Sequence, residues 1–261
     1  MTIHQAGPLL TDAPVGRHFA QLHANAGGLT EAVSVFLEAG LRRGQCVVLI
    51  ATRVHADLLV TRLERARLHP AALRASGQLL LLDPDAMLAK FMREGMPHWS
   101  EFRIALSEIV ERAAGVGSQT RIYSELTSVL WHQGRPTAAI RLEEFWNALA
   151  RLSSFSLYCS YLLDPHCEHS YAGPVEEIGR THTDILGTVE DERFGVALDV
   201  ASREVFGIAV SQMIGYASTV HEGERRFPSG LRTMLWVRRY LPSSGAAVLE
   251  RAHRYFQQRS P

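Results

Sequence analysis

The sequence predicts an α/β protein in which helices cover both faces of a doubly wound, mainly parallel sheet, followed by a helical C-terminal region. Short apolar runs rich in β-branched residues alternate with segments of helical periodicity from residue 17 to about residue 163. Beyond Pro165 the strand signals stop and the helical periodicity continues. We therefore expect a lead-in over 1–15, an α/β domain over 16–165 and a helical extension over 166–261.

The predicted elements follow one another in regular order. A short strand over 17–22 precedes a helix whose apolar residues recur at helical spacing between Leu29 and Leu41. The next run, Cys46–Ala51, is apolar at every position, as a strand buried on both faces should be. The remaining expected elements are a helix over 56–67, a strand over 78–82, helices over 86–92 and 102–114, a strand over 120–124, a helix from Pro136, a strand over 155–163, and helices over 175–186, over 193–216 and on either side of 242–245.

Composition favours a folded protein of the cytoplasm. The 261 residues are 46% hydrophobic, and 27 basic side chains balance 27 acidic ones, so the chain lacks the single-sign field that recruits nucleic acid. Three cysteines are too few for a disulfide framework, and no apolar run approaches the roughly 20 residues that cross a bilayer. We expect no membrane contact. Only Lys90 among the basic residues is a lysine.

The stretch from His23 to Thr30 stands where a phosphate-binding loop would follow the first strand. In the GxxxxGK[ST] motif, backbone amides cradle phosphate and the lysine neutralises its charge. Here Gly28 and Thr30 match the motif, but His23 replaces its first glycine and Leu29 replaces its lysine. The lost contact is worth on the order of 2–5 kcal/mol, so tight ATP binding and hydrolysis are not expected. Gly27, Gly28 and the first helical amides still leave room for a weakly bound nucleotide or other anion.

Three stretches, 16–52, 77–102 and 121–161, resemble the MEDS sensory domain family. The most specific block is "LWHQGRPTAAIRLEEFWNALA" at 130–150. The resemblance implies a RecA/KaiC-like fold that has given up ATP hydrolysis and senses small molecules. Family members often read His-Ile-Cys near the start, whereas this chain reads His18-Phe19-Ala20, so a cysteine contact is not transferred.

Ligands of doubly wound sheets bind beyond the carboxyl ends of the strands. This rule and the loop motif give the candidate ligand-binding residues His18, His23, Gly27, Gly28, Thr30, Thr52, Asp83, Glu125 and Tyr161. By resemblance, Glu125 stands where KaiC-type ATPases keep a metal-binding acid, and His18 matches a family residue in the first strand. The plainer interpretations are a solvated or capping carboxylate for Glu125 and a hydrogen-bonded core histidine for His18.

No cofactor, metal site or catalytic residue is predicted. The weak metal candidates are His166, Cys167, His169 and His182, whose spacing differs from the paired, repeated ligands of zinc sites, and we expect them to be structural. No Ser-His-Asp or Cys-His arrangement is recognisable from sequence order.

The C-terminal residues 221–261 contain eight arginines and three glutamates among apolar residues. We interpret them as amphipathic helices that face a partner or a second copy in a homodimer, and nucleic acid is not the expected partner. The leading hypothesis is a non-enzymatic sensory or regulatory signal-transduction module, which binds a small-molecule ligand or a regulatory protein through a degenerate phosphate-loop cleft. The alternatives are a nucleotide-binding protein with weak or no hydrolysis, and a protein–protein adaptor that acts through its C-terminal helices.

Overall fold

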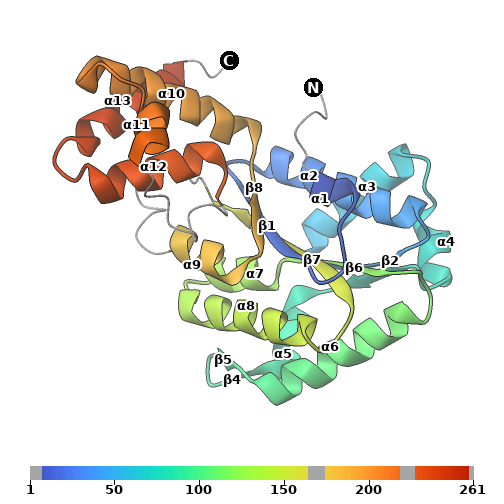
Figure 1. Cartoon of the computed structure of the whole chain (residues 1–261). Helices are drawn as coiled ribbons and strands as arrows, with labels where there is room; N and C mark the ends of the chain where they lie inside the picture. Colours follow the sequence, from blue (N-terminus) through green and yellow to red (C-terminus); the bar gives the residue numbers. More distant parts are fainter. Residues whose placement is uncertain (1–7, 164–173, 218–226, 259–261) are drawn as a thin grey trace.

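Six parallel strands form the central sheet of the computed structural model, which describes residues 8–163, 174–217 and 227–258 (Figure 1). Their spatial order is β3-β2-β6-β7-β1-β8, and each neighbouring pair is parallel. The predicted α/β class with a parallel sheet is therefore confirmed. The strands are β1 (His18–His23), β2 (Cys46–Ile50), β3 (Leu79–Leu82), β6 (Thr120–Ser124), β7 (Phe155–Leu162) and β8 (Asp184–Leu186).

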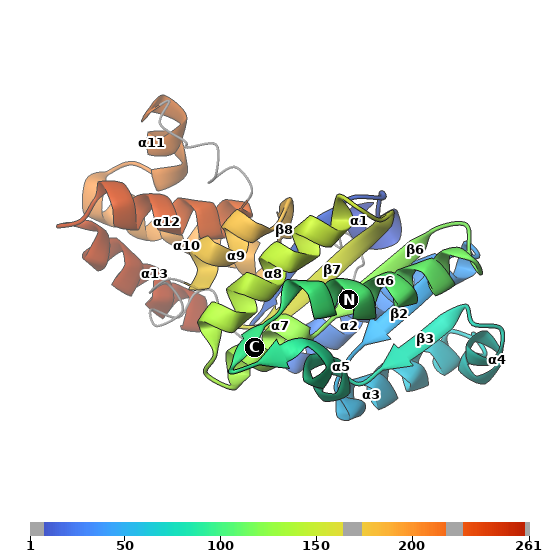
Figure 2. The same ribbon diagram turned by 90° about the horizontal axis from the view of Figure 1, so that it is seen from below.

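Helices cover both faces of the sheet, as Figures 1 and 2 show. One face carries α1 (Pro8–Thr11), α2 (Ala26–Arg42), α3 (Arg53–Arg65) and α4 (Pro70–Ala75). The other carries α5 (Pro84–Phe91), α6 (Trp99–Ala114), α7 (Leu126–His132), α8 (Pro136–Ala150) and α9 (Pro174–Thr181).

Strand β2 shows why the sheet needs both helical layers. All five of its residues are buried, and successive side chains point to opposite faces. Val47 and Leu49 belong to the core beneath α2 and α3, whereas Val48 and Ile50 belong to the core beneath α5–α8. An uninterrupted apolar run is stable only when both faces are covered.

Arg121 of β6 is a fully buried cation within this apolar sheet. Its guanidinium donates hydrogen bonds to the backbone carbonyl oxygens of Leu10, Thr11 and Phe36 and to the side-chain oxygen of Gln45. These bonds satisfy the desolvated charge and fasten α1 to the sheet. Leu10 is itself fully buried, so the chain is already packed within the segment that the sequence predicts to be a loose lead-in.

A short antiparallel hairpin also lies where the sequence predicts no strand. Its strands β4 (Met92–Arg93) and β5 (Met96–Pro97) are joined by Glu94 and Gly95, both with positive φ angles, 47° and 85°. Two consecutive left-handed residues are typical of the tight turns that match the twist of a hairpin.

Beyond residue 163 the structure differs from the predicted run of helices. The helix expected over 175–186 ends at Thr181, and β8 then pairs with β1, so the sheet gains a sixth strand that covers the open edge of β1. The helix expected over 193–216 is divided into α10 (Val189–Phe206) and α11 (Val210–Ala217). Gly207 ends α10 with a left-handed φ of 75°, a conformation that glycine adopts without strain.

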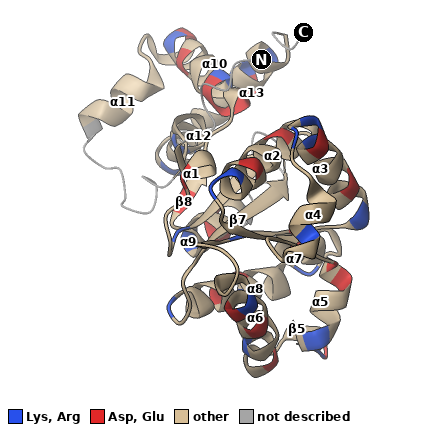
Figure 3. Cartoon of the chain, turned by 90° about the vertical axis from the view of Figure 1, so that its right-hand side faces the viewer, with Lys and Arg blue, Asp and Glu red and all other residues tan. Residues whose placement is uncertain are grey.

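The last helices, α12 (Ser229–Tyr240) and α13 (Gly245–Gln258), pack with α10 at the β8 end of the sheet (Figure 2). Buried Asp191 of α10 accepts hydrogen bonds from the amides of Gly230 and Leu231, and so ties α10 to the start of α12. Basic and acidic residues are interspersed along the outer helices (Figure 3). Among the described residues, no helix is long and apolar enough to cross a membrane.

Candidate functional site

A cavity of about 430 Å³ opens at the carboxyl edge of the sheet, beyond β2 and β6. The chain leaves these neighbouring strands in opposite directions, β2 toward β3 and β6 toward β7, which makes this crevice a topological switch point of the sheet. The cavity, called the cleft below, is lined by Ala26, Leu29, Thr30, Thr52, Val54, His55, Leu58, Glu125, Ser128, Val129, His132, Gln133 and Leu162.

The start of α2 differs from an open phosphate loop. The helix begins at Ala26, so Gly27 and Gly28 lie in its first turn and only residues 24–25 separate it from β1. Asn25 caps the helix, and its side-chain oxygen accepts a hydrogen bond of 2.8 Å from the Gly28 amide. The Thr30 hydroxyl donates to the Ala26 carbonyl oxygen at 2.8 Å. The Gly28 amide and the Thr30 hydroxyl, two of the groups that would hold phosphate, are therefore engaged within the helix.

Glu125 is the main charged group of the cleft and is 8% exposed. One carboxylate oxygen accepts hydrogen bonds from the Tyr123 hydroxyl, at 3.1 Å, and from His55 Nδ1, and the other accepts from the Thr52 amide at 2.7 Å. Burial by itself raises the pKa of the Glu125 carboxyl, but the bonds and charge of His55, together with those from Thr52 and Tyr123, outweigh it and lower the pKa. The cleft thus holds an ionised carboxylate beside an imidazole.

His23 ends β1 next to this site and is only 4% exposed. Its Nε2 lies 3.5 Å from the Tyr158 hydroxyl, which donates to the side-chain oxygen of Gln21. Burial, and then the charge of His55, lower the pKa of His23 to about 4. The imidazole is consequently neutral at physiological pH.

The structure brings some of the predicted site residues together and separates others. Thr30, Thr52 and Glu125 line the cleft, and Gly27, Gly28 and His23 lie at its α2 side. Asp83 caps α5 through a 2.8 Å hydrogen bond from the Ala86 amide and does not line the cleft. His55, which the sequence analysis missed, lies in the first turn of the helix after β2, close to the strand end that Thr52 marks.

His18 and Tyr161 lie on the opposite face of the sheet, beneath α8. They surround Glu143 of α8: His18 Nε2 is 3.1 Å from one carboxylate oxygen, and the Tyr161 hydroxyl donates to the other. His182, from the turn between α9 and β8, brings its Nε2 to 3.6 Å from the oxygen that faces His18. Four side chains have donor atoms that all lie within 4.8 Å of one another, and we call them the buried cluster: His18, Glu143, Cys159 and His182.

The other weak metal candidates of the sequence, His166, Cys167 and His169, lie outside the described residues. Their placement therefore has no part in the geometry of the buried cluster.

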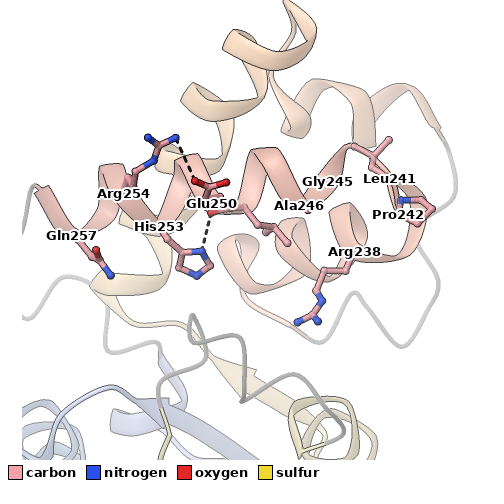
Figure 4. Close-up of a pocket in the computed structure, with 10 residues that line it drawn as sticks. Arg238, Leu241, Pro242, Gly245, Ala246, Glu250, His253, Arg254 and Gln257 are labelled. Atoms are coloured by element: carbon pink, nitrogen blue, oxygen red, sulfur yellow. Dashed lines mark hydrogen bonds and ion pairs between the residues drawn. The ribbon is translucent and has the colours of Figure 1, made fainter.

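A second, larger hollow of about 620 Å³ lies between α12 and α13 (Figure 4). Leu241, Pro242, Ala246 and Leu249 give it an apolar wall, and charged side chains such as Arg238 and Glu250 stand at its rim. Figure 4 shows Glu250 within an ion pair to Arg254, with N–O distance 3.9 Å. This hollow belongs to the C-terminal helices and is separate from the sheet edge.

The comparisons with known proteins agree with the resemblance. Residues 17–183, more than half of the chain, match the family described as MEDS, the methanogen/methylotroph, DcmR sensory domain. A search of curated proteins found no match. The matched region begins at the start of β1 and ends directly before β8, so it contains the cleft and every member of the buried cluster. The chain belongs to the MEDS family of sensory domains.

Proposed function

We propose that the protein is a non-enzymatic sensor that binds a small, largely apolar molecule in the cleft and passes the signal through its C-terminal helices. The observation that carries this proposal is the cavity itself, about 430 Å³ at the switch point of the sheet. Ligand pockets of this size, mainly apolar with a few polar groups, are typical of small-molecule sites. Membership of a sensory family supports the same role.

The polar groups of the cleft indicate which ligands it favours. The Glu125 carboxylate disfavours an anion, because no lysine stands beside it and Leu29 occupies the position of the phosphate-binding lysine. Among the described residues, His55 Nε2 is buried without a hydrogen-bond partner, while Nδ1 donates to Glu125. Because the Nδ1 proton is used by Glu125, Nε2 is the ring atom that remains to contact a ligand, and it accepts a hydrogen bond in the neutral form of the ring. A neutral or cationic molecule with one hydrogen-bond donor, such as an alcohol or an amine, suits this lining.

These contacts also weigh against the nucleotide-binding alternative. A triphosphate would meet an α2 terminus whose Gly28 amide is already capped by Asn25. Glu125 already accepts three hydrogen bonds, two at one oxygen and one at the other, which leaves only about one lone-pair site for a magnesium ion.

The hollow between α12 and α13 favours the adaptor hypothesis as a second candidate. Its apolar wall and charged rim are the features of a groove that accepts a helix or loop of a partner. The two roles are compatible, because a sensor needs a surface through which ligand binding is read. A homodimer and a regulatory protein both remain proposals for what binds there.

Native mass spectrometry of freshly purified protein tests the sensor proposal first, since it reports a retained small molecule and the number of subunits together. Thermal-shift screening with small alcohols, amines and carboxylic acids then tests the ligand class. We expect the alcohols or amines to raise the unfolding temperature, and the acids to leave it unchanged.

A cleft-filling variant locates the response. Leu58→Trp places an indole in the lining of the cleft. Ile104→Trp on α6 is the matched control, because the side chains of Leu58 and Ile104 are similarly exposed, at 52% and 55%. The stabilising compound should lose its effect on Leu58→Trp and keep it on Ile104→Trp. Micromolar binding of ATP with magnesium that Thr30→Ala abolishes would refute the sensor proposal in favour of a nucleotide-binding protein.

A further inference from the structure

The buried cluster brings four potential metal ligands to one point from four separate segments. His18 comes from β1, Cys159 from β7, Glu143 from α8 and His182 from the turn before β8. The side chains of His18, Glu143 and His182 are 2%, 3% and 0% exposed, and Cys159 is fully buried. Burying so many polar groups together is costly unless a partner compensates them.

Four of the six donor pairs have distances close to those of a tetrahedral zinc site, and the two pairs that join His182 to His18 and Cys159 lie within 4.8 Å. Zn–N and Zn–O bonds of about 2.0–2.1 Å and Zn–S bonds of about 2.3 Å place neighbouring donors roughly 3.3–3.6 Å apart. In the cluster, Glu143 Oε2 lies 3.1 Å from His18 Nε2, 3.6 Å from His182 Nε2 and 3.9 Å from Cys159 Sγ. Cys159 Sγ is 3.5 Å from His18 Nε2. Shifts of up to about an ångström, mainly of His182, would give regular coordination.

Both histidines are oriented as metal ligands usually are, with one ring nitrogen held by an acceptor. Asn147 donates from its amide nitrogen to the Thr181 carbonyl at 2.6 Å, so its side-chain oxygen is the atom that accepts from His18 Nδ1 at 2.9 Å. His182 Nδ1 lies 2.7 Å from the Ile178 carbonyl, which only accepts. Each Nδ1 therefore carries a proton, and each Nε2 is the ring atom that lies among the donor atoms of the cluster, where it could bind a metal ion.

The charges of the cluster also fit a divalent cation. His18 Nε2 lies 3.1 Å from one carboxylate oxygen of Glu143, a separation at which either a proton or a metal ion can lie between the two atoms. One thiolate, one carboxylate and two neutral imidazoles would neutralise Zn²⁺. A neutral assembly is the form that a dry interior accommodates.

A catalytic role for the same atoms does not fit their surroundings. Cys159, His18 and Asn147 follow the order nucleophile, base and orienting amide that cysteine proteases use. However, Cys159 is fully buried, so a substrate would have no access to its thiol.

We propose that the buried cluster is a closed, four-coordinate zinc site that fastens the turn before β8 to the core of the sheet. Four protein donors leave no open position, which is the arrangement of structural zinc. Because His182 lies between α9 and β8, the metal would fix the point from which the chain continues into the C-terminal helices. This site is separate from the cleft of the proposed function.

The first test measures metal in the full chain by inductively coupled plasma mass spectrometry, after refolding with zinc and dialysis without chelator. We expect about one zinc per chain. Cys159→Ser should hold zinc at least about ten-fold more weakly in competition with a chromogenic chelator, and Asn147→Ala, which frees His18, about 10–100-fold more weakly. Cys46→Ser, which alters the other described buried cysteine, is the matched control and should bind as the wild type does.

The absorption spectrum of the cobalt-substituted wild-type chain tests the site without requiring that any variant folds. A tetrahedral site with one thiolate should show intense visible bands of Co²⁺ and a sulfur-to-cobalt charge-transfer band, which Cys46→Ser retains. Combined substitution of His166, Cys167 and His169 by alanine should leave the zinc content unchanged. Refolded wild-type chain without bound metal or without the charge-transfer band would overturn the proposal, as would zinc that the triple variant loses and Cys159→Ser keeps.

Discussion

Acidification is expected to destabilise the fold through His23, in a pH range set by burial of its ring. The pKa of His23 is lowered from 6.5 to about 4, first by burial and then by His55. Between these values the unfolded chain takes up a proton that the folded chain does not, so stability is lost as the pH falls. One pKa unit corresponds to about 1.4 kcal/mol, so lowering the pH from about 7.5 to about 5 should cost about 2 kcal/mol through this group.

Urea unfolding at the two pH values, followed by far-UV circular dichroism, measures the effect. His23→Gln replaces the ring with a side chain that does not titrate, so its free energy of unfolding should fall by about 2 kcal/mol less than that of the wild type. The comparison is needed because the pKa of His182 is also lowered to about 4, so His182 makes the free energy of unfolding fall with pH by the same amount in both proteins. If the free energy of unfolding fell by the same amount between the two pH values in the wild type and in His23→Gln, the neutral, buried state of His23 would be refuted.

Three further substitutions test the packing and the cleft. Gly40→Ala places a Cβ 2.7 Å from Arg121 Cδ, and should lower the free energy of unfolding in urea by about 1–3 kcal/mol, whereas an unchanged midpoint would show that the arginine moves freely. Glu125→Gln removes the carboxylate that accepts a hydrogen bond from His55, and should lower the free energy of unfolding by about 1–3 kcal/mol in the same assay. An unchanged free energy of unfolding would show that the carboxyl is already protonated in the wild type. Leu29→Lys restores the lysine of the phosphate-loop motif, yet calorimetry should still detect no ATP binding, because the helix begins too early for the cradle to form. Measurable affinity for ATP with magnesium would contradict that geometry.

Periodicity predicted the main strands and helices because they follow local rules. The apolar run of β2 and the alternating order of strands and helices are legible in any short window of sequence. Strand β8 was not predicted, because its three residues pair with β1, more than 160 residues away in the sequence. Nothing in the local sequence distinguishes these residues from a helix. The break between α10 and α11 has a local signal, Gly207, whose position inside a periodic pattern did not show that it ends the helix.

Of the two candidate sites, part of the cleft was predictable from the sequence and the buried cluster was not. Strand ends predicted Thr52 and Glu125, because the carboxyl edge of a parallel sheet follows from the order of strands. The metal-capable residues were sought at short spacing around residue 166, whereas the buried cluster draws on positions 18, 143, 159 and 182. Only His182 belongs to both sets. The distances that make a tetrahedron arise from strand register and helix packing, which sequence spacing does not encode.

Strand β7 explains how the cleft and the buried cluster occur back to back in one sheet. Its successive side chains point to opposite faces: Tyr158 and Ser160 bond into the network of Gln21, His23 and Tyr123, while Cys159 and Tyr161 face Glu143 on the other side. A shift of β7 by one residue would exchange the two sets of side chains. The polar groups on each face therefore fix the register of the strand, and displacement of β7 by a ligand in the cleft would be resisted by the contacts beneath α8.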